Sequence, residues 1–178
     1  MRILIFQRKS LRAPPSNLIV LGVDPGLATT GWGVVQKILA DQTLKAFGVI
    51  LTSSSLPLPK RLHQIYSDLS QIIETYRPSV LAIEELFFAK FAVSIASTAQ
   101  ARGAILLAAA QRNIPVVEYN PRAVKMAMTG FASASKNQMQ SMVQKHFRLK
   151  DLPRPDDAAD ALAIALCHLQ TRKELVAA

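Results

Sequence analysis

Four carboxylic acids stand in apolar surroundings, where charged side chains are uncommon. The chain has only 12 Asp and Glu residues. Asp24 and Glu84 each end a short apolar run, and Asp157 and Asp160 lie at the start of an apolar C-terminal segment. If the four side chains meet, their charges repel, which raises some of their pKa values. Hard divalent cations such as Mg²⁺ or Mn²⁺ relieve that repulsion, and two such ions about 3.5 to 4 Å apart can activate a water and stabilise the leaving oxygen of a phosphodiester.

Each acid also has a simpler interpretation. Asp24 precedes a Pro-Gly pair and could merely open a turn. Strand alternation leaves open whether Glu84 or its neighbour Glu85 faces the other acids. The side chain of Asp156 points about 100° away from that of Asp157 on an ideal helix, so we interpret Asp156 as an acid that compensates the helix dipole. The residue types alone therefore indicate an acidic cluster without fixing all its members.

The first part of the chain predicts an antiparallel meander. Residues 18–23 form a branched apolar run typical of a strand that is buried on both faces, and residues 31–38 and 44–52 are also strand-like. Asp24 should therefore lie at a strand end, at the rim of a sheet. Residues 62–76 repeat apolar side chains at helical spacing and predict an amphipathic helix.

The second part of the chain predicts alternating strands and helices. Residues 80–83 form a short strand, and the Ala-rich residues 92–111 form a helix that is apolar nearly all round and needs cover on more than one side, partly from a second copy of the chain. Asp157 and Asp160 are three apart and share one helix face. The order is that of a mixed α/β fold, in which parallel strand ends and a helix laid across them can bring the four acids together. The remaining elements are a strand at 114–119 and helices at 123–128, at 135–147 and from 155 onward.

The composition favours an acidic partner. The formal net charge is +9, from 21 Lys and Arg against 12 Asp and Glu, and 178 residues suit one domain. Residues 1–16 are basic and are expected to be a disordered extension, with a transit peptide or a misplaced start as alternatives, so the folded domain is expected to span residues 17–178.

Cys167 lies in an apolar run and is expected to be a buried, inert thiol in a reducing, cytoplasmic setting. Arg102 argues against a membrane span at residues 91–111, and no membrane contact is expected.

Four short blocks stand in order along the chain. They are Gly22-Val23-Asp24-Pro25-Gly26 with Thr30-Gly31-Trp32-Gly33, Ala82-Ile83-Glu84 with Phe87, Gln100-Ala101-Arg102-Gly103, and Asp157-Ala158-Ala159-Asp160-Ala161-Leu162-Ala163. Together they resemble the RuvC Holliday-junction resolvase family, in order and at the family's spacing, over roughly residues 18–169. The basic extension before Leu18, the short tail after Leu169 and the extra acid at Asp156 depart from the family pattern, and none of them affects a catalytic match.

The resemblance implies a ribonuclease H-like fold with a mixed five-stranded sheet flanked by helices. It also implies a homodimeric endonuclease that resolves four-way (Holliday) DNA junctions by paired, symmetric, Mg²⁺-dependent nicks in homologous recombination and DNA repair. The family's four catalytic carboxylates correspond to Asp24, Glu84, Asp157 and Asp160, which favours Glu84 over Glu85. Our hypothesis for the mechanism is that these acids hold two Mg²⁺ ions, for which Mn²⁺ substitutes, that Asp24 bridges the ions, and that in-line attack by water leaves a 5′-phosphate and a 3′-hydroxyl.

The resemblance also implies DNA contacts and partners. Lys125 and Lys136 correspond to lysines that face DNA, and Phe87 corresponds to an aromatic residue that stacks on an unpaired base at the junction. Without the resemblance, solvated lysines and a core phenylalanine would be the simpler interpretations. The helix that contains residues 100–103 corresponds to the family's dimer helix. The family works beside RuvA and RuvB, which are therefore the expected protein partners.

Two other functions are compatible with parts of the sequence. Asp24 and the later Thr29-Thr30-Gly31 block also resemble the first phosphate loop of actin-like ATPases and sugar kinases, but those proteins need two such domains. A junction-binding protein without catalysis would keep the basic surface and could lose acids. All four acids are present, so the sequence favours the nuclease over the non-catalytic junction-binding protein.

Overall fold

The computed structural model describes residues 17–86 and 92–171. Its centre is a five-stranded sheet with the strand order β3-β2-β1-β4-β5. The first three strands form the predicted antiparallel meander, whereas β4 runs parallel to β1 and β5 runs parallel to β4. Consequently β1, β4 and β5 end at the same edge of the sheet. The strands are β1 (Asn17–Asp24), β2 (Thr29–Ile38), β3 (Asp41–Leu51), β4 (Val80–Glu84) and β5 (Val116–Tyr119).

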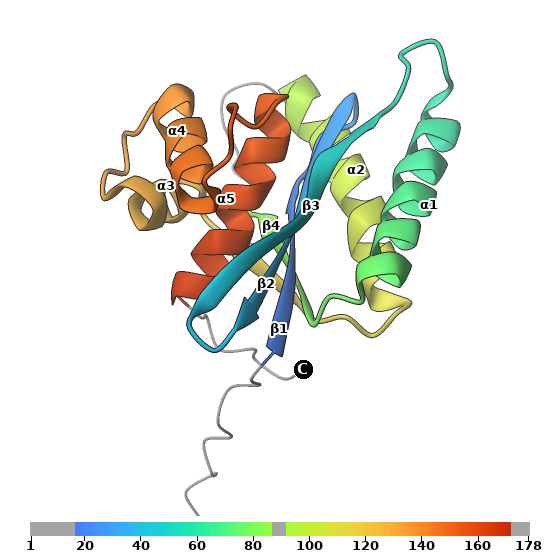
Figure 1. Cartoon of the computed structure of the whole chain (residues 1–178). Helices are drawn as coiled ribbons and strands as arrows, with labels where there is room; N and C mark the ends of the chain where they lie inside the picture. Colours follow the sequence, from blue (N-terminus) through green and yellow to red (C-terminus); the bar gives the residue numbers. More distant parts are fainter. Residues whose placement is uncertain (1–16, 87–91, 172–178) are drawn as a thin grey trace, which may run out of the picture.

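Helices cover both faces of the sheet (Figure 1). Two clusters of buried apolar side chains correspond to the two helical layers. Helix α5 packs directly on β1 and β2, and α3 and α4 pack on α5. This layered, mixed arrangement confirms the predicted α/β class. One face carries α1 (Leu58–Tyr76) and α2 (Ala92–Ala110), and the other carries α3 (Pro121–Thr129), α4 (Lys136–Phe147) and α5 (Asp156–Thr171).

Strand β1 lies inside the sheet because its side chains are apolar on both faces. Val20 belongs to the cluster that includes α5, whereas Leu21 and Val23 belong to the cluster that includes α1 and α2. All three side chains are fully buried. A strand that is buried on both faces reads as a continuous apolar run. The run at residues 18–23 predicted this position correctly.

Capping side chains determine where α3 and α4 begin. Ser135 Oγ accepts a hydrogen bond from the backbone amide of Gln138, and the Gln138 side chain accepts one from the backbone amide of Ser135. Asn120 caps α3 by accepting a hydrogen bond from the backbone amide of Arg122. Ser135 is thus the N-cap of α4, and Lys136 is the first residue of that helix.

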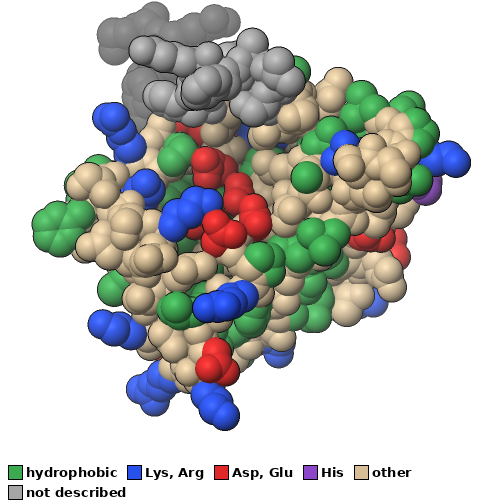
Figure 2. Space-filling model, turned by 90° about the horizontal axis from the view of Figure 1, so that it is seen from above, with side chains coloured by type: hydrophobic (Ala, Val, Ile, Leu, Met, Phe, Trp, Pro, Cys, Tyr) green, Lys and Arg blue, Asp and Glu red, His purple; other side chains and the backbone are tan. Residues whose placement is uncertain are grey.

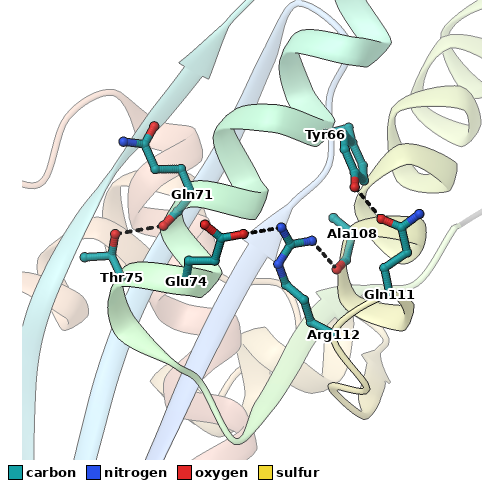
Figure 3. Close-up of polar contacts among 7 residues, drawn as sticks. All are labelled: Tyr66, Gln71, Glu74, Thr75, Ala108, Gln111 and Arg112. Atoms are coloured by element: carbon teal, nitrogen blue, oxygen red, sulfur yellow. Dashed lines mark hydrogen bonds and ion pairs between the residues drawn. The ribbon is translucent and has the colours of Figure 1, made fainter.

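Helices α1 and α2 are tied together near their C-terminal ends (Figure 3). Arg112, just after α2, forms an ion pair with Glu74 of α1 at 2.5 Å. Tyr66 Oη donates a hydrogen bond to Gln111 Oε1. These contacts lie where β4 and β5 begin, away from the edge at which these strands end.

Helix α2 leaves one of its faces open to solvent. Ala96, Ala99, Gln100, Gly103 and Leu107 are exposed, and Leu107 is 52% exposed. A Cβ atom added at Gly103 would meet nothing within 4 Å. These positions recur at the spacing of one helix face. We call them the open face of α2.

Among the described residues, no helix has the length and apolar character that crossing a bilayer requires.

Candidate active site

Two of the four acids lie side by side at the edge where the parallel strands end. Val23 of β1 and Ile83 of β4 are neighbours in the parallel register. Asp24 and Glu84 follow them directly and are the last residues of their strands. The backbone register therefore brings the two acids together, because parallel neighbours end on the same side of the sheet.

A close approach of α5 to the sheet brings Asp157 to the same edge. Gly22 of β1 and Gly31 of β2 lie directly under α5. A Cβ atom at Gly22 would collide with the carbonyl oxygen of Ala161, and one at Gly31 would collide with that of Asp157. Only glycine permits such an approach. Because Gly31 pairs with Asp24 across the two strands, Asp157 lies over the end of β1.

A pocket of about 330 Å³ is lined by three of the four predicted acids, Asp24, Glu84 and Asp160, and Asp157 is not part of its wall. We call it the acidic pocket. Its charged side chains are Asp24, Glu84, Asp160, Lys125 and Lys136. In Figure 2, acidic side chains gather near the middle of the visible face, with basic side chains beside them and around the rim. The acidic pocket thus combines concentrated negative charge with lysines on its wall.

Burial and mutual repulsion raise the pKa values of the acids. Burial is the main cause that raises the pKa of Asp24 to about 8, and repulsion by Glu84, Asp160 and Asp157 adds to it. Burial is also the main cause of the raised pKa values of Glu84 and Asp160. Near neutral pH, such a cluster favours either protons or nearby cations.

Two lysines lie within the field of these acids. Lys136 Nζ is 2.7 Å from Asp156 Oδ2 and 4.0 Å from Asp160 Oδ2. The charge of Lys136 lowers the pKa of Asp24, and that of Lys125 lowers the pKa of Asp160. Asp156 therefore pairs with Lys136. Its interpretation as an acid that compensates the helix dipole did not predict this contact.

The chemistry of the acidic pocket fits a hard divalent cation. Carboxylate oxygens are the ligands that Mg²⁺ and Mn²⁺ prefer. Burial first and repulsion by the neighbouring acids second raise the pKa of Asp24, and a cation bound nearby would favour its ionised form. Within residues 17–86 and 92–171, no three His, Cys, Asp or Glu side chains form a ready-made ligand set.

All the predicted site residues except Phe87 lie in the described part of the chain. Phe87 falls outside the described residues, so its stacking on a base stays a prediction. Glu84 lines the acidic pocket, whereas Glu85 Oε2 accepts a hydrogen bond from Asn120 Nδ2 at 3.3 Å. Of the two neighbours that strand alternation could not separate, Glu84 is the one that joins the other acids.

Sequence reasoning missed the part played by Arg102. Its side chain is 6% exposed, and its guanidinium donates a hydrogen bond to the backbone carbonyl oxygen of Glu84 and forms an ion pair with Glu118 at 2.5 Å. A buried charged side chain needs a hydrogen-bonding or oppositely charged partner. That argument could have predicted a partner for Arg102, although it could not have identified it.

A larger cavity of about 660 Å³ lies between α1 and the C-terminal end of α2. Its wall includes Glu74, Arg77 and Arg112. Glu74 is already paired with Arg112 (Figure 3). The charge distribution that favours a cation therefore belongs to the acidic pocket, despite its smaller size.

Comparisons with known proteins agree with this geometry. Residues 20–168 match the family model of crossover junction endodeoxyribonuclease RuvC. The chain is 52% identical over 155 residues to RuvC of Endomicrobium trichonymphae, which covers 86% of this chain and 82% of that protein. It is 50% identical over 155 residues to RuvC of Chloroflexus aggregans, with 87% and 94% covered.

A solved structure is also similar to this chain. The structure of T. thermophilus RuvC in complex with Holliday junction substrate aligns with a TM-score of 0.82 and 36% identity, and the alignment covers 88% of this chain and 95% of that chain. The likeness confirms the predicted ribonuclease H-like fold. On the family match and these identities, the chain belongs to the crossover junction endodeoxyribonuclease RuvC family.

Proposed function

We propose that this chain is a metal-dependent endodeoxyribonuclease that resolves four-way DNA junctions in recombination and repair. The observation that carries the proposal is the acidic pocket, in which acids from β1, β4 and α5 lie beside lysines from α3 and α4. The acids suit cations and the lysines suit phosphates. Nucleases of this family generally depend on divalent metal ions, which agrees with the donor chemistry of the pocket.

In this proposal Asp24, Glu84, Asp157 and Asp160 hold two Mg²⁺ ions, for which Mn²⁺ substitutes. Asp24 would be the central ligand, because Glu84, Asp157 and Asp160 all lie close enough to repel its charge. The ions supply charge neutralisation and activation of water at the phosphodiester. The chain fixes the four carboxylates on two strand ends and one helix, which are parts of the buried core and keep the site in place.

Lys125 and Lys136 contact the DNA backbone in this proposal. Both side chains line the acidic pocket, and the capped starts of α3 and α4 fix the backbone near each of them. Lysines beside the acids would hold phosphates next to the scissile bond and contribute affinity without reading sequence. Phe87, three residues after Glu84, is proposed to stack on an unpaired base.

The proposed enzyme is a homodimer that associates through the open face of α2. This face offers small side chains around Gly103 and an apolar side chain at Leu107, which is half-exposed. Small residues allow two helices to approach closely, and burial of Leu107 would supply apolar contact. A two-fold axis would relate two acidic pockets, as paired nicks in a symmetric junction require.

We also propose a cytoplasmic location and cooperation with RuvA and RuvB. Family membership supports the partners. Cys167 is the chain's one cysteine and is buried, which agrees with a reducing compartment. Co-purification of tagged protein with RuvA, RuvB and junction DNA, compared with a junction-free control, would test the partners.

Cleavage of a strand-labelled synthetic four-way junction tests the proposed function. Wild type and Asp24→Asn are compared in Mg²⁺, with a linear duplex of the same sequence as the control substrate. We expect paired, symmetric nicks in the junction from the wild type, and junction binding without nicks from Asp24→Asn. The cut ends should carry a 5′-phosphate and a 3′-hydroxyl.

Two results would contradict the proposal. Junction binding without cleavage by both proteins, at several Mg²⁺ and Mn²⁺ concentrations and on junctions of varied sequence, would favour the non-catalytic junction-binding protein. Equal cleavage by wild type and Asp24→Asn would show that the nuclease activity does not depend on the acidic pocket.

A further inference from the structure

Lys136 lies between two cavities. One is the acidic pocket, which it shares with Asp24, Glu84 and Asp160. The other is an outer cavity of about 490 Å³, whose wall includes Lys136, Arg154 and Asp156. The side chain thus stands at the boundary between the acids and the outer surface.

Asp156 holds the ammonium group of Lys136 on the outer side of this boundary. The Nζ to Oδ2 distance is 2.7 Å for Asp156 and 4.0 Å for Asp160. The Lys136 side chain is 67% exposed and that of Asp156 is 42% exposed. An exposed lysine side chain populates many rotamers, so its nearest charged partner determines where the ammonium group lies.

The acids of the pocket attract the same ammonium group. Asp160 is the second carboxylate within ion-pair distance, and Asp24 and Glu84 lie further inside. An ammonium group that moved inward would neutralise the acids and take up the space between them. It would then compete with a divalent cation for the same carboxylate oxygens, as any competing cation does.

We propose that Asp156 is a positioning residue that keeps Lys136 at the rim of the acidic pocket and so leaves the four carboxylates free for metal ions. The inference rests on the proposed function, in which these carboxylates bind divalent cations. The backbone of both partners is fixed, since Lys136 begins α4 behind the Ser135 cap and Asp156 begins α5. The ion pair therefore joins two helix starts across the mouth of the pocket.

Binding of Mn²⁺ to the DNA-free, full-length protein tests this proposal by calorimetry, without use of the nuclease activity. We expect Asp156→Asn to weaken Mn²⁺ binding about two- to fivefold, the range of one exposed ion pair. In a Lys136→Met background the same change should have no effect, because the competing ammonium group is absent. Asp156→Glu, which keeps the carboxylate, should restore most of the affinity.

Asp151→Asn is the matched control. It removes one negative charge from the exposed segment just before α5, and we expect Mn²⁺ binding close to that of the wild type. If Asp156→Asn weakens Mn²⁺ binding equally in the wild-type and Lys136→Met backgrounds, the effect is direct attraction between Asp156 and the ion, and the proposal is wrong. Unchanged binding in Asp156→Asn, with only a small loss of thermal stability, would restore the helix-dipole interpretation.

Failure of the proposed function gives a different pattern. If the four carboxylates do not bind metal, the wild type and every variant show no Mn²⁺ binding, and both proposals fall. If the carboxylates bind metal and only the role of Asp156 is wrong, the wild type binds Mn²⁺ and the effects of the two substitutions add.

Discussion

The guanidinium group of Arg102, on α2, donates a hydrogen bond to the backbone carbonyl oxygen of Glu84, the last residue of β4. The same group forms an ion pair with Glu118 of β5 at 2.5 Å. Helix α2 therefore holds the ends of two strands at the edge that carries the acidic pocket. Gly103, the next residue, belongs to the open face of α2, so the proposed dimer contact and the proposed active site share one helix.

Removal of this guanidinium should loosen the end of β4. Arg102→Met keeps an apolar stem but removes the hydrogen bond to the Glu84 carbonyl oxygen and the ion pair with Glu118. We expect the free energy of unfolding, measured with urea, to fall by about 1.5–3 kcal/mol. Arg112→Met is the control, and it should cost less because its partner Glu74 is 66% exposed. Equal losses in the two variants would contradict the buried role of Arg102.

A methyl group at Gly31 should displace the start of α5. Gly31→Ala places Cβ against the Asp157 carbonyl oxygen, and we expect a loss of about 1–3 kcal/mol in unfolding free energy together with a large loss of junction cleavage. Gly103→Ala adds the same methyl group where a single subunit leaves open space, and in protein diluted to the monomer it should leave stability unchanged or raise it by up to about 1 kcal/mol. Normal cleavage by Gly31→Ala would show that α5 can move without harm to the site.

The sequence predicted the main-chain part of the site because apolar runs identify buried strands. The run at residues 18–23 placed Asp24 at a strand end, and that position followed from the residues alone. The choice of Glu84 over Glu85 did not follow in the same way. It depends on the end of β4, where Asn120 binds Glu85, and the sequence resolved it only through the family resemblance.

Contacts between distant parts of the chain were harder to predict. The pairing of Lys136 with Asp156 spans 20 residues, and its geometry depends on how α4 packs on α5. Likewise, the close approach of α5 to Gly22 and Gly31 is a property of packing between layers. Local periodicity contains no information on which side chains meet across two layers, so these relationships required the structure.

Ionisation of Asp24 should make the metal-free protein less stable as the pH rises. Its pKa is raised to about 8, so between about pH 4 and pH 8 the folded protein retains a proton that the unfolded chain has released. The free energy of unfolding then falls with rising pH. We expect the melting temperature in EDTA to fall less steeply for Asp24→Asn than for the wild type from pH 5 to pH 8. Asp151→Asn is the charge control, and parallel curves for wild type and Asp24→Asn would contradict the raised pKa.

A charge on the open face of α2 should prevent dimerisation. Leu107→Arg places a guanidinium at the proposed contact, and we expect sedimentation to show a monomer whose fold is intact by circular dichroism. Cleavage of the junction should become slow and unpaired. Leu39→Arg makes the same change at a side chain that is 78% exposed in the turn after β2, and it should leave the dimer unchanged. Sedimentation of Leu107→Arg as a dimer would place the interface elsewhere.

Phosphate contacts by Lys125 and Lys136 should be visible in the salt dependence of junction binding. Each contact releases about one counterion, so Lys125→Ala and Lys136→Ala should each weaken binding and reduce the slope of log K against log salt by about 1. Lys45→Ala, at an exposed position of β3, should change neither quantity if the DNA lies over the acidic pocket. Equal slopes for all three variants and the wild type would remove both lysines from the DNA contact. A reduced slope for Lys45→Ala alone would instead place the DNA over the outer edge of the sheet, which β3 forms.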